Sequence, residues 1–236
     1  QFRSLRKGLA PFFVIWSLVL IPIALQPDLS TAMLIGLLGV MIVFAAGVRI
    51  THFLFLGLLI VPFLQKQLSV GFRADRIEAF LNPALDPTGA GFQVRQSLVA
   101  LGSGGLTGVG IGEGRQKFGF LPEAHNDFIF AMIGEEWGLL GVIFLVALYM
   151  GIVLVGFRIA SRAPDLFGEL LALGFTNLIA LHAVLHMSVG LSLVPPTGLA
   201  LPLVSWGRSS LVVTLAAIGV IISVARSAPG GKAARA

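Results

Sequence analysis

The sequence predicts an all-α polytopic membrane protein with six transmembrane helices, and three observations lead to this fold class. Of the 236 residues, 56% are hydrophobic and only 11% are charged, and the mean hydropathy of +0.95 lies well above that of water-soluble domains. Six apolar runs follow one another, most of them near the roughly 20 residues that a helix needs to cross a bilayer. Cysteine is absent, which excludes disulfides and thiolate metal sites.

Three of these runs lie in the first part of the chain. The first covers about Leu9 to Leu25, and the turn at residues 26–30 leads into the second, from Thr31 to Val48. The third starts near Phe53 and is short for a span, because a proline and three polar residues interrupt it at positions 62–67. We therefore expect this third helix to tilt.

Residues 71–137 are predicted to form one loop outside the membrane that carries short amphipathic helices. Phe72–Leu81 place apolar side chains on one face and polar ones elsewhere, as in a helix lying in the membrane interface. A second short helix is predicted over Phe92–Leu101, and seven glycines follow it. The order of residues after them does not match a phosphate-binding P-loop. The segment is either a flexible connector or a loop whose backbone N–H groups bind an anion.

The last three runs are predicted to complete the set of spans. Leu139–Ala160 is about 22 residues, or ~33 Å as a helix, which is long enough to cross. Leu170–Val194 and the shorter Ser210–Ala225 follow, and the polar segment 226–236 is predicted to be a disordered cytoplasmic tail.

The charges predict the orientation, because six spans place both ends on one side. That side holds nine basic and two acidic residues, a net +7, and the other holds seven basic and nine acidic, a net −2. Since basic residues gather on the cytoplasmic side, both ends are expected there, with loop 71–137 facing outward. The basic residues stand at span ends and form no stripe, so topology explains them better than nucleic-acid binding.

A charged segment at Leu101–Gly141 is the predicted functional region, because charges near hydrocarbon are costly. Within it, Glu123 and Asp127 lie four residues apart on a helix predicted to begin at Pro122. Asp127 stands where the polar loop meets an apolar helix, a setting that could raise the carboxylate pKa toward that of a general base. The alternative is that both acids belong to a solvated rim.

Other polar residues have weaker functional signals. Glu135 and Glu136 are expected on the rim, close to an interfacial tryptophan. His182 and His186 have the spacing of a metal pair, but without a third ligand a hydrogen-bonded packing role is favoured, as it is for Asn177. Arg208 is expected on the same side as Asp127, where it either snorkels or contacts an anion.

The segment Leu101–Gly141, which contains GEGRQKFGFLPEAHNDFIF, resembles the signature region of the SEDS (shape, elongation, division and sporulation) family, the FtsW/RodA proteins. Further matches are LQPDLSTA, FLNPALDPTGAGFQVRQSLVALGSGG and PTGLALPLVSWGRSSL, which follow in family order across nearly the whole chain. The alanine of PEAHND and the preceding RQK favour the FtsW branch. Two departures are visible: Asn126 stands where the family has threonine, and Arg208 where it has glycine.

The resemblance implies a ten-span peptidoglycan glycosyltransferase that polymerises lipid II on the outer face of the bacterial cytoplasmic membrane during cell division. It also implies a class B penicillin-binding transpeptidase as partner, other division-complex membrane proteins, and a divalent cation. The spans here would be the last six of the ten, so that residues 1–236 form one membrane domain of a longer protein, in line with a first residue, Gln1, that is not methionine. No organic cofactor is expected.

Site residues follow from this resemblance and from the chemistry. Asp127 matches the catalytic carboxylate. A pyrophosphate leaving group is already a stable anion, so one base suffices, while positive charge is needed beside the leaving group. Arg115 and Lys117 are the nearest basic candidates, and the remaining candidates for substrate binding are Glu123, His125 and Arg208. No metal-ligand cluster is evident beyond Asp127 and Glu123.

Two other functions stay open from hydropathy and charge alone. A multispan protein with broken segments could move lipid II across the bilayer as a flippase. The chain could also be a non-catalytic scaffold that activates the transpeptidase.

Overall fold

The computed structural model describes residues 10–26, 28–48, 65, 71–86 and 88–228, and within these ranges it contains helices and turns but no strand. The all-α prediction is confirmed for this part of the chain. Two compact units are formed. The first comprises Gln1–Lys66, Leu154–Leu181 and Ala217–Ala236, and the second comprises Gln67–Val153 and His182–Ala216.

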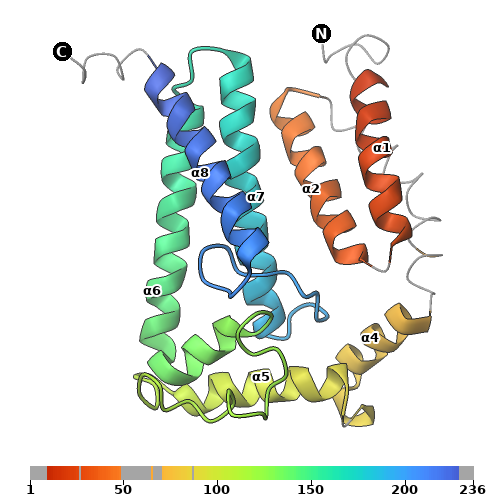
Figure 1. The fold of residues 1–236 in the computed structure, drawn as a ribbon, viewed down its shortest axis with the longest axis vertical. Helices are drawn as coiled ribbons and strands as arrows, with labels where there is room; N and C mark the ends of the chain where they lie inside the picture. Colours follow the sequence, from red (N-terminus) through yellow and green to blue (C-terminus); the bar gives the residue numbers. More distant parts are fainter. Residues whose placement is uncertain (1–9, 27, 49–64, 66–70, 87, 229–236) are drawn as a thin grey trace. The chain divides into compact units, whose positions relative to one another are not determined.

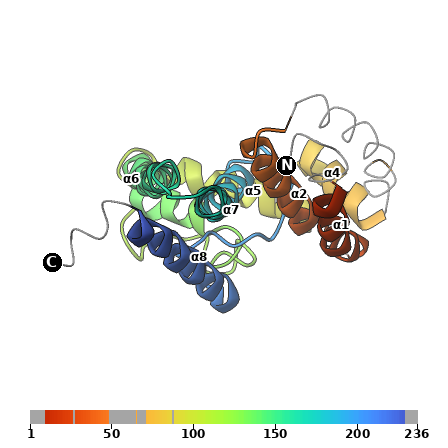
Figure 2. The same ribbon diagram turned by 90° about the horizontal axis from the view of Figure 1, so that it is seen from above.

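In the first unit, helices α1 (Ala10–Leu25) and α2 (Leu29–Ala45) lie side by side (Figures 1 and 2). Asp28 caps α2, because its Oδ1 accepts the N–H of Thr31 at 3.0 Å. The indole of Trp16 packs directly on α2 at Gly39, where an added Cβ would lie 2.5 Å from the ring nitrogen. Two predicted spans are thus confirmed as helices. The third, from Phe53, falls outside the described residues.

The first unit also contains parts of three longer helices, α6 (Ile129–Ala160), α7 (Leu166–Gly190) and α8 (Arg208–Ser227). In this unit the three helices contact one another through small side chains, because Ala160, Ala172 and Val224 form one buried cluster. Small residues at such contacts allow helix backbones to approach closely.

In the described part of the chain, α6, α7 and α8 are the helices long and apolar enough to cross a membrane, while α1 and α2 are shorter apolar helices. The first two residues of the predicted disordered tail belong to α8, and residues from 229 onward lie outside the described ranges.

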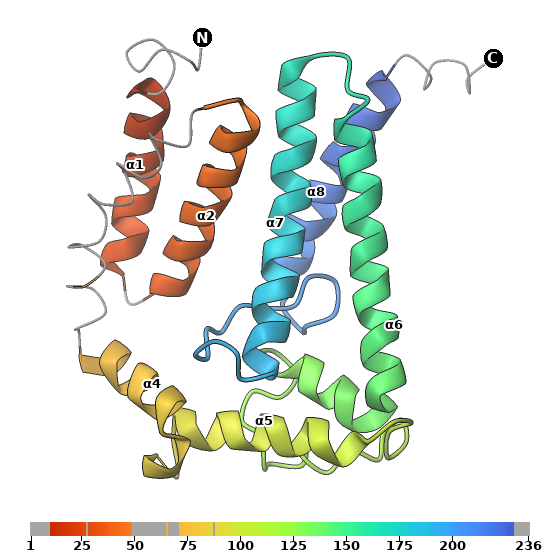
Figure 3. The ribbon, with the colours of Figure 1, turned by 180° about the vertical axis from the view of Figure 1, so that it is seen from behind.

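The second unit begins with α4 (Gly71–Leu81), the 3-10 helix η2 (Pro83–Leu85) and α5 (Ala90–Gly104), which contact one another (Figure 3). The amphipathic helix predicted at 72–81 is confirmed as α4. The second predicted helix is confirmed too, but α5 runs two residues further at its start and three at its end. The carboxylate of Asp86 fixes the turn before α5, because it accepts the N–H of Gly89 at 2.8 Å and of Gly91 at 3.0 Å.

Helix α6 has a kink at Gly138, where φ is +66° and ψ is −163°. The segment Leu139–Ala160 after the kink has the predicted bounds of a span. Residues 129–137, which belong to the predicted outer loop with its helices, form a helical segment before the kink. The loop after α5 packs into the kink: Leu139 donates its N–H to the Gly105 carbonyl at 3.0 Å. A Cβ on Gly138 would lie 2.3 Å from the Gly108 nitrogen, so both a left-handed backbone and a close approach require glycine here.

Candidate active site

A cavity of about 420 Å³ opens in the second unit. Five segments form its walls: helix α4, the turn and start of α5, the turn before α6, the end of α7, and the loop between α7 and α8. The lining residues are Arg76, Asp86, Gly89, Ala90, Gln93, Asp127, Phe128, Val189, Pro196, Thr197 and Gly198.

Asp127 lies at the end of residues 121–128, which form a series of turns directly before α6. The prediction of a helix starting at Pro122 is wrong, because Glu123 has a φ of +50° that a helix does not permit. One turn is nevertheless closed, since the N–H of Asp127 donates to the Glu123 carbonyl at 2.9 Å. Phe128 is fully buried in an apolar cluster with residues of α5, α6 and α7. Its burial anchors the turn and thereby holds Asp127 at the cavity.

Burial raises the pKa of Asp127 above its ordinary value of 3.8, and the negative charge of Glu123 raises it further. The positive charge of Arg76 acts in the opposite direction. The other acid of the cavity differs: backbone N–H groups of Gly91 and Gly89 lower the pKa of Asp86, which therefore stays ionised. Of the two carboxylates, Asp127 is the one whose pKa is raised, and a carboxylate with a higher pKa is the stronger proton acceptor.

The loop between α7 and α8, residues 191–207, is attached directly to the turn that carries Asp127. Ser205 donates from Oγ to the Asn126 carbonyl at 2.7 Å, and its Oγ accepts the N–H of Leu201 at 2.8 Å. The N–H of Trp206 donates to the His125 carbonyl at 3.1 Å. These bonds hold the 191–207 loop against the two residues that precede Asp127.

Gly198 of the same loop faces the carboxylate itself. A Cβ built on it would lie 3.6 Å from Asp127 Oδ2, and its φ is +68°. The left-handed backbone explains why glycine stands at this point of the cavity wall.

The buried histidine of α7 supports the 191–207 loop. His186 is 1% exposed and its Nδ1 donates to the Leu199 carbonyl at 2.7 Å. The prediction of a hydrogen-bonded packing role is confirmed for His186. In the described part of the chain no three His, Cys, Asp or Glu side chains are close enough together to hold a metal ion.

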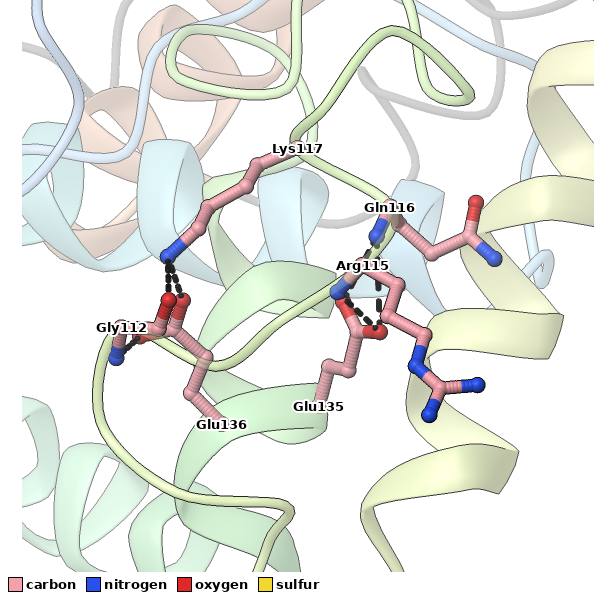
Figure 4. Close-up of polar contacts among 6 residues, drawn as sticks. All are labelled: Gly112, Arg115, Gln116, Lys117, Glu135 and Glu136. Atoms are coloured by element: carbon pink, nitrogen blue, oxygen red, sulfur yellow. Dashed lines mark hydrogen bonds and ion pairs between the residues drawn. The ribbon is translucent and has the colours of Figure 1, made fainter.

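The glycine-rich loop is held in place by two carboxylates (Figure 4). Glu135 is 2% exposed and accepts the N–H groups of Arg115 at 2.9 Å and Gln116 at 3.3 Å. Glu136 accepts the N–H of Gly112 at 3.0 Å. The expectation that both glutamates belong to a solvated rim is therefore wrong for Glu135. The loop does bind anions through its backbone, but the anions are the chain's own side chains.

Most of the predicted substrate-binding residues lie outside the cavity lining. Lys117 forms an ion pair with Glu136 at 2.6 Å, and the exposed guanidinium of Arg115 points away from both glutamates (Figure 4). His125 is exposed, and Arg208 is the exposed first residue of α8. Glu123 is also exposed, and it accepts a hydrogen bond from the Asn126 side chain at 2.9 Å. Asp127 is the member of the predicted set that lines the cavity.

Sequence reasoning missed Arg76, the basic residue of the cavity lining. A signal was present, because Arg76 stands on the polar face of an amphipathic helix expected on the same side as Asp127. The segments quoted for the family resemblance also contain most of the other lining residues, including Asp86, Gln93 and Thr197.

Comparisons with known proteins agree with the resemblance. The sequence model of the FtsW/RodA/SpoVE family, described as cell cycle protein, matches residues 1–229. The probable peptidoglycan glycosyltransferase FtsW of Geobacter metallireducens is 45% identical over 224 residues, which are 94% of this chain and 60% of that protein. Stage V sporulation protein E of Bacillus subtilis is 44% identical over 225 residues, 94% of this chain and 61% of that protein. The chain thus spans about 60% of the length of these relatives.

Solved structures show the same similarity. A chain from a study of structural coordination of polymerization and crosslinking by a peptidoglycan synthase complex superposes with a TM-score of 0.74 at 29% identity, covering 95% of this chain and 63% of that one. The rod shape determining protein RodA of Thermus thermophilus gives a TM-score of 0.60 at 27% identity, covering 97% of this chain and 60% of that one.

Proposed function

The chain belongs to the FtsW/RodA/SpoVE family of cell cycle proteins, and from this membership we propose that it carries the catalytic site of a peptidoglycan glycosyltransferase that polymerises lipid II. The observation that carries the proposal is Asp127, a half-buried carboxylate at a cavity, with a pKa raised by its burial. The relatives named as probable peptidoglycan glycosyltransferases support the choice of reaction.

In the proposed reaction, a sugar hydroxyl attacks the anomeric carbon of a second, lipid-linked sugar. Asp127 accepts the hydroxyl proton as the new carbon–oxygen bond forms, and the bond from the anomeric carbon to the pyrophosphate oxygen breaks with its electron pair. The lipid pyrophosphate leaves as an anion that needs no proton. One carboxylate is therefore enough, unlike the pair that glycosidases use. The raised pKa suits this task, because a carboxylate with a higher pKa accepts the hydroxyl proton more readily.

A divalent cation of the kind that the family implies finds no group of three His, Cys, Asp or Glu ligands in the described part of the chain, and Glu123 lies outside the cavity lining. We therefore derive no catalytic step through a metal ion.

We further propose that the protein lies in the bacterial cytoplasmic membrane with the cavity on the outer side, where it works in cell division with a class B penicillin-binding transpeptidase. The charge difference of +7 against −2 supports this orientation, and the similarity to a chain of a peptidoglycan synthase complex supports the partner. A topology reporter fused after Ala236 should be active in the cytoplasm, and one inserted near Gly119 should be active outside. Cytoplasmic activity from the Gly119 site would overturn the orientation.

The test of function is Asp127→Asn in the purified full-length protein with its partner and labelled lipid II. The amide keeps the size of the side chain but cannot accept the proton, so glycan synthesis should fall about 10²–10⁴-fold. Glu123→Gln is the control, and it should cost less because Glu123 lies outside the cavity lining. Near-normal glycan synthesis by Asp127→Asn would show that Asp127 is not the general base. Movement of lipid II across the bilayer by the unmodified protein, without glycan products, would support a flippase instead.

A further inference from the structure

The cavity contains a positive charge with no partner among the described residues. Arg76 lines the cavity that Asp127 lines, and its guanidinium forms no hydrogen bond or ion pair with another side chain in the described ranges. The other basic residues near the site are placed differently. Lys117 is paired with Glu136, and Arg115 lies outside the cavity lining.

We propose that Arg76 binds the diphosphate of the lipid-linked sugar in this cavity and stays with it as the leaving group departs. The proposal rests on the proposed function, since it names the residue that receives the leaving group of that reaction. A guanidinium presents paired N–H donors that match two phosphate oxygens, and it keeps its charge at every pH of interest.

The remaining cavity groups leave Arg76 available to an anion. Asp86 is the ionised carboxylate of the cavity, but both of its oxygens already accept backbone N–H groups, at 2.8 and 3.0 Å. Thr197, also in the lining, has a buried hydroxyl oxygen with no hydrogen-bond partner. A phosphate oxygen would provide one, and an unpartnered buried polar atom is otherwise costly. The volume of about 420 Å³ lies within the range of small-molecule sites.

The position of Arg76 is fixed by the fold. Helix α4 buries Ala79 and contacts both η2 and α5, so Arg76 stands on a packed element and lines the same cavity as Asp127. The two residues would therefore act on different groups of the substrates. The attacking hydroxyl approaches the carboxylate, and the departing diphosphate meets the guanidinium.

The experiment uses the full-length protein with its partner in lipid nanodiscs. Arg76→Gln removes the charge, Arg76→Lys keeps it, and Arg95→Gln removes a matched exposed arginine on α5 that does not line the cavity. Inhibition of glycan synthesis is measured with two probes, polyprenyl diphosphate and inorganic pyrophosphate. We expect Arg76→Gln to raise the inhibition constant of polyprenyl diphosphate about 10- to 100-fold and to lower kcat. Arg76→Lys should recover part of the loss, and Arg95→Gln should stay within about twofold.

Two results would overturn the proposal. An inhibition constant unchanged in Arg76→Gln would show that the diphosphate does not contact this residue. A shift only in the pH dependence of kcat, with both inhibition constants unchanged, would show that Arg76 acts through Asp127 alone. Weakened binding of inorganic pyrophosphate in parallel with the lipid product would support recognition of the diphosphate itself.

Direct binding of polyprenyl diphosphate to the Asp127→Asn protein, with and without Arg76→Gln, separates this inference from the proposed function. Binding that depends on Arg76, together with no glycan synthesis by the unmodified protein, would support the diphosphate site and refute the polymerase. If the unmodified protein polymerises lipid II but Arg76→Gln does not change the binding of polyprenyl diphosphate, the diphosphate site is refuted and the polymerase is not.

Discussion

Ser205→Ala tests whether the 191–207 loop positions the catalytic carboxylate. Ser205 makes two hydrogen bonds through one oxygen, from Leu201 N at 2.8 Å and to the Asn126 carbonyl at 2.7 Å. Because Asn126 directly precedes Asp127, the serine connects one wall of the cavity to the base. The hydroxyl does not line the cavity, so its loss should change the placement of Asp127 more than the binding of substrate.

The magnitude follows from these two bonds. Each contributes about 0.5–1.5 kcal/mol net, so alanine weakens the attachment by about 1–3 kcal/mol, or roughly 5- to 150-fold in the population of the attached loop. The bond from Trp206 N to the His125 carbonyl remains, which places the expected loss in the lower part of that range. We expect kcat for lipid II polymerisation to fall about 5- to 30-fold, with KM changed less than about threefold.

Two variants accompany the measurement. Ser205→Thr keeps the hydroxyl and should retain most of the activity, and Ser209→Ala alters an exposed serine of α8 and should change little. The thermal unfolding midpoint of each variant separates a displaced base from a misfolded protein. A kcat within twofold of the unmodified protein for Ser205→Ala would refute the positioning role.

Three further results are expected. Glu135→Ala leaves two backbone N–H groups unpaired and should destabilise the folded protein by about 2–4 kcal/mol, as measured by thermal unfolding. Glu136→Ala removes a more exposed ion pair and should cost about 1 kcal/mol in the same measurement. Gly138→Ala should cost more in the same assay than the roughly 1–3 kcal/mol of a positive φ alone, because its Cβ would also lie 2.3 Å from the Gly108 nitrogen. Gly151→Ala, in open space within a helix, should stay within about 1 kcal/mol of the unmodified protein. The base must be ionised to accept a proton, and the pKa of Asp127 is raised. As the pH is lowered, kcat should therefore begin to fall at a higher pH than it would with an ordinary aspartate as the base. A kcat that stays constant down to the ordinary aspartate pKa of 3.8 would contradict this.

Much of the fold could be predicted because hydropathy and helix punctuation are local properties of a sequence. The end of α6 at Ala160 could be predicted from a strongly apolar run, and the bounds of α4 could be predicted within one residue from its amphipathic period. The kink within α6 could not be found in this way. At the kink, Gly138 lies close to Gly108, and the sequence does not state which glycine meets which.

The candidate site could be predicted only in part, because only some of its features are local in the sequence. Asp127 could be selected, since a carboxylate at the border of a polar and an apolar segment is a local pattern. Glu135 and Glu136 could not be placed, because their partners are backbone N–H groups about 20 residues away. Arg76 could not be assigned either, because a basic residue on an amphipathic helix is usually only solvated, and the cavity that Arg76 lines is formed by five segments of the chain.

The opposing charges around Asp127 make its basicity depend on what occupies the cavity. Glu123 raises the pKa of Asp127 and Arg76 lowers it. A diphosphate bound to Arg76 would offset the positive charge, so the lowering effect would weaken and the pKa would rise further. By linkage, the same coupling means that a protonated Asp127 favours a bound diphosphate. Asp127 would therefore be the stronger base when the lipid-linked sugar is bound, which is the state in which a hydroxyl must lose its proton.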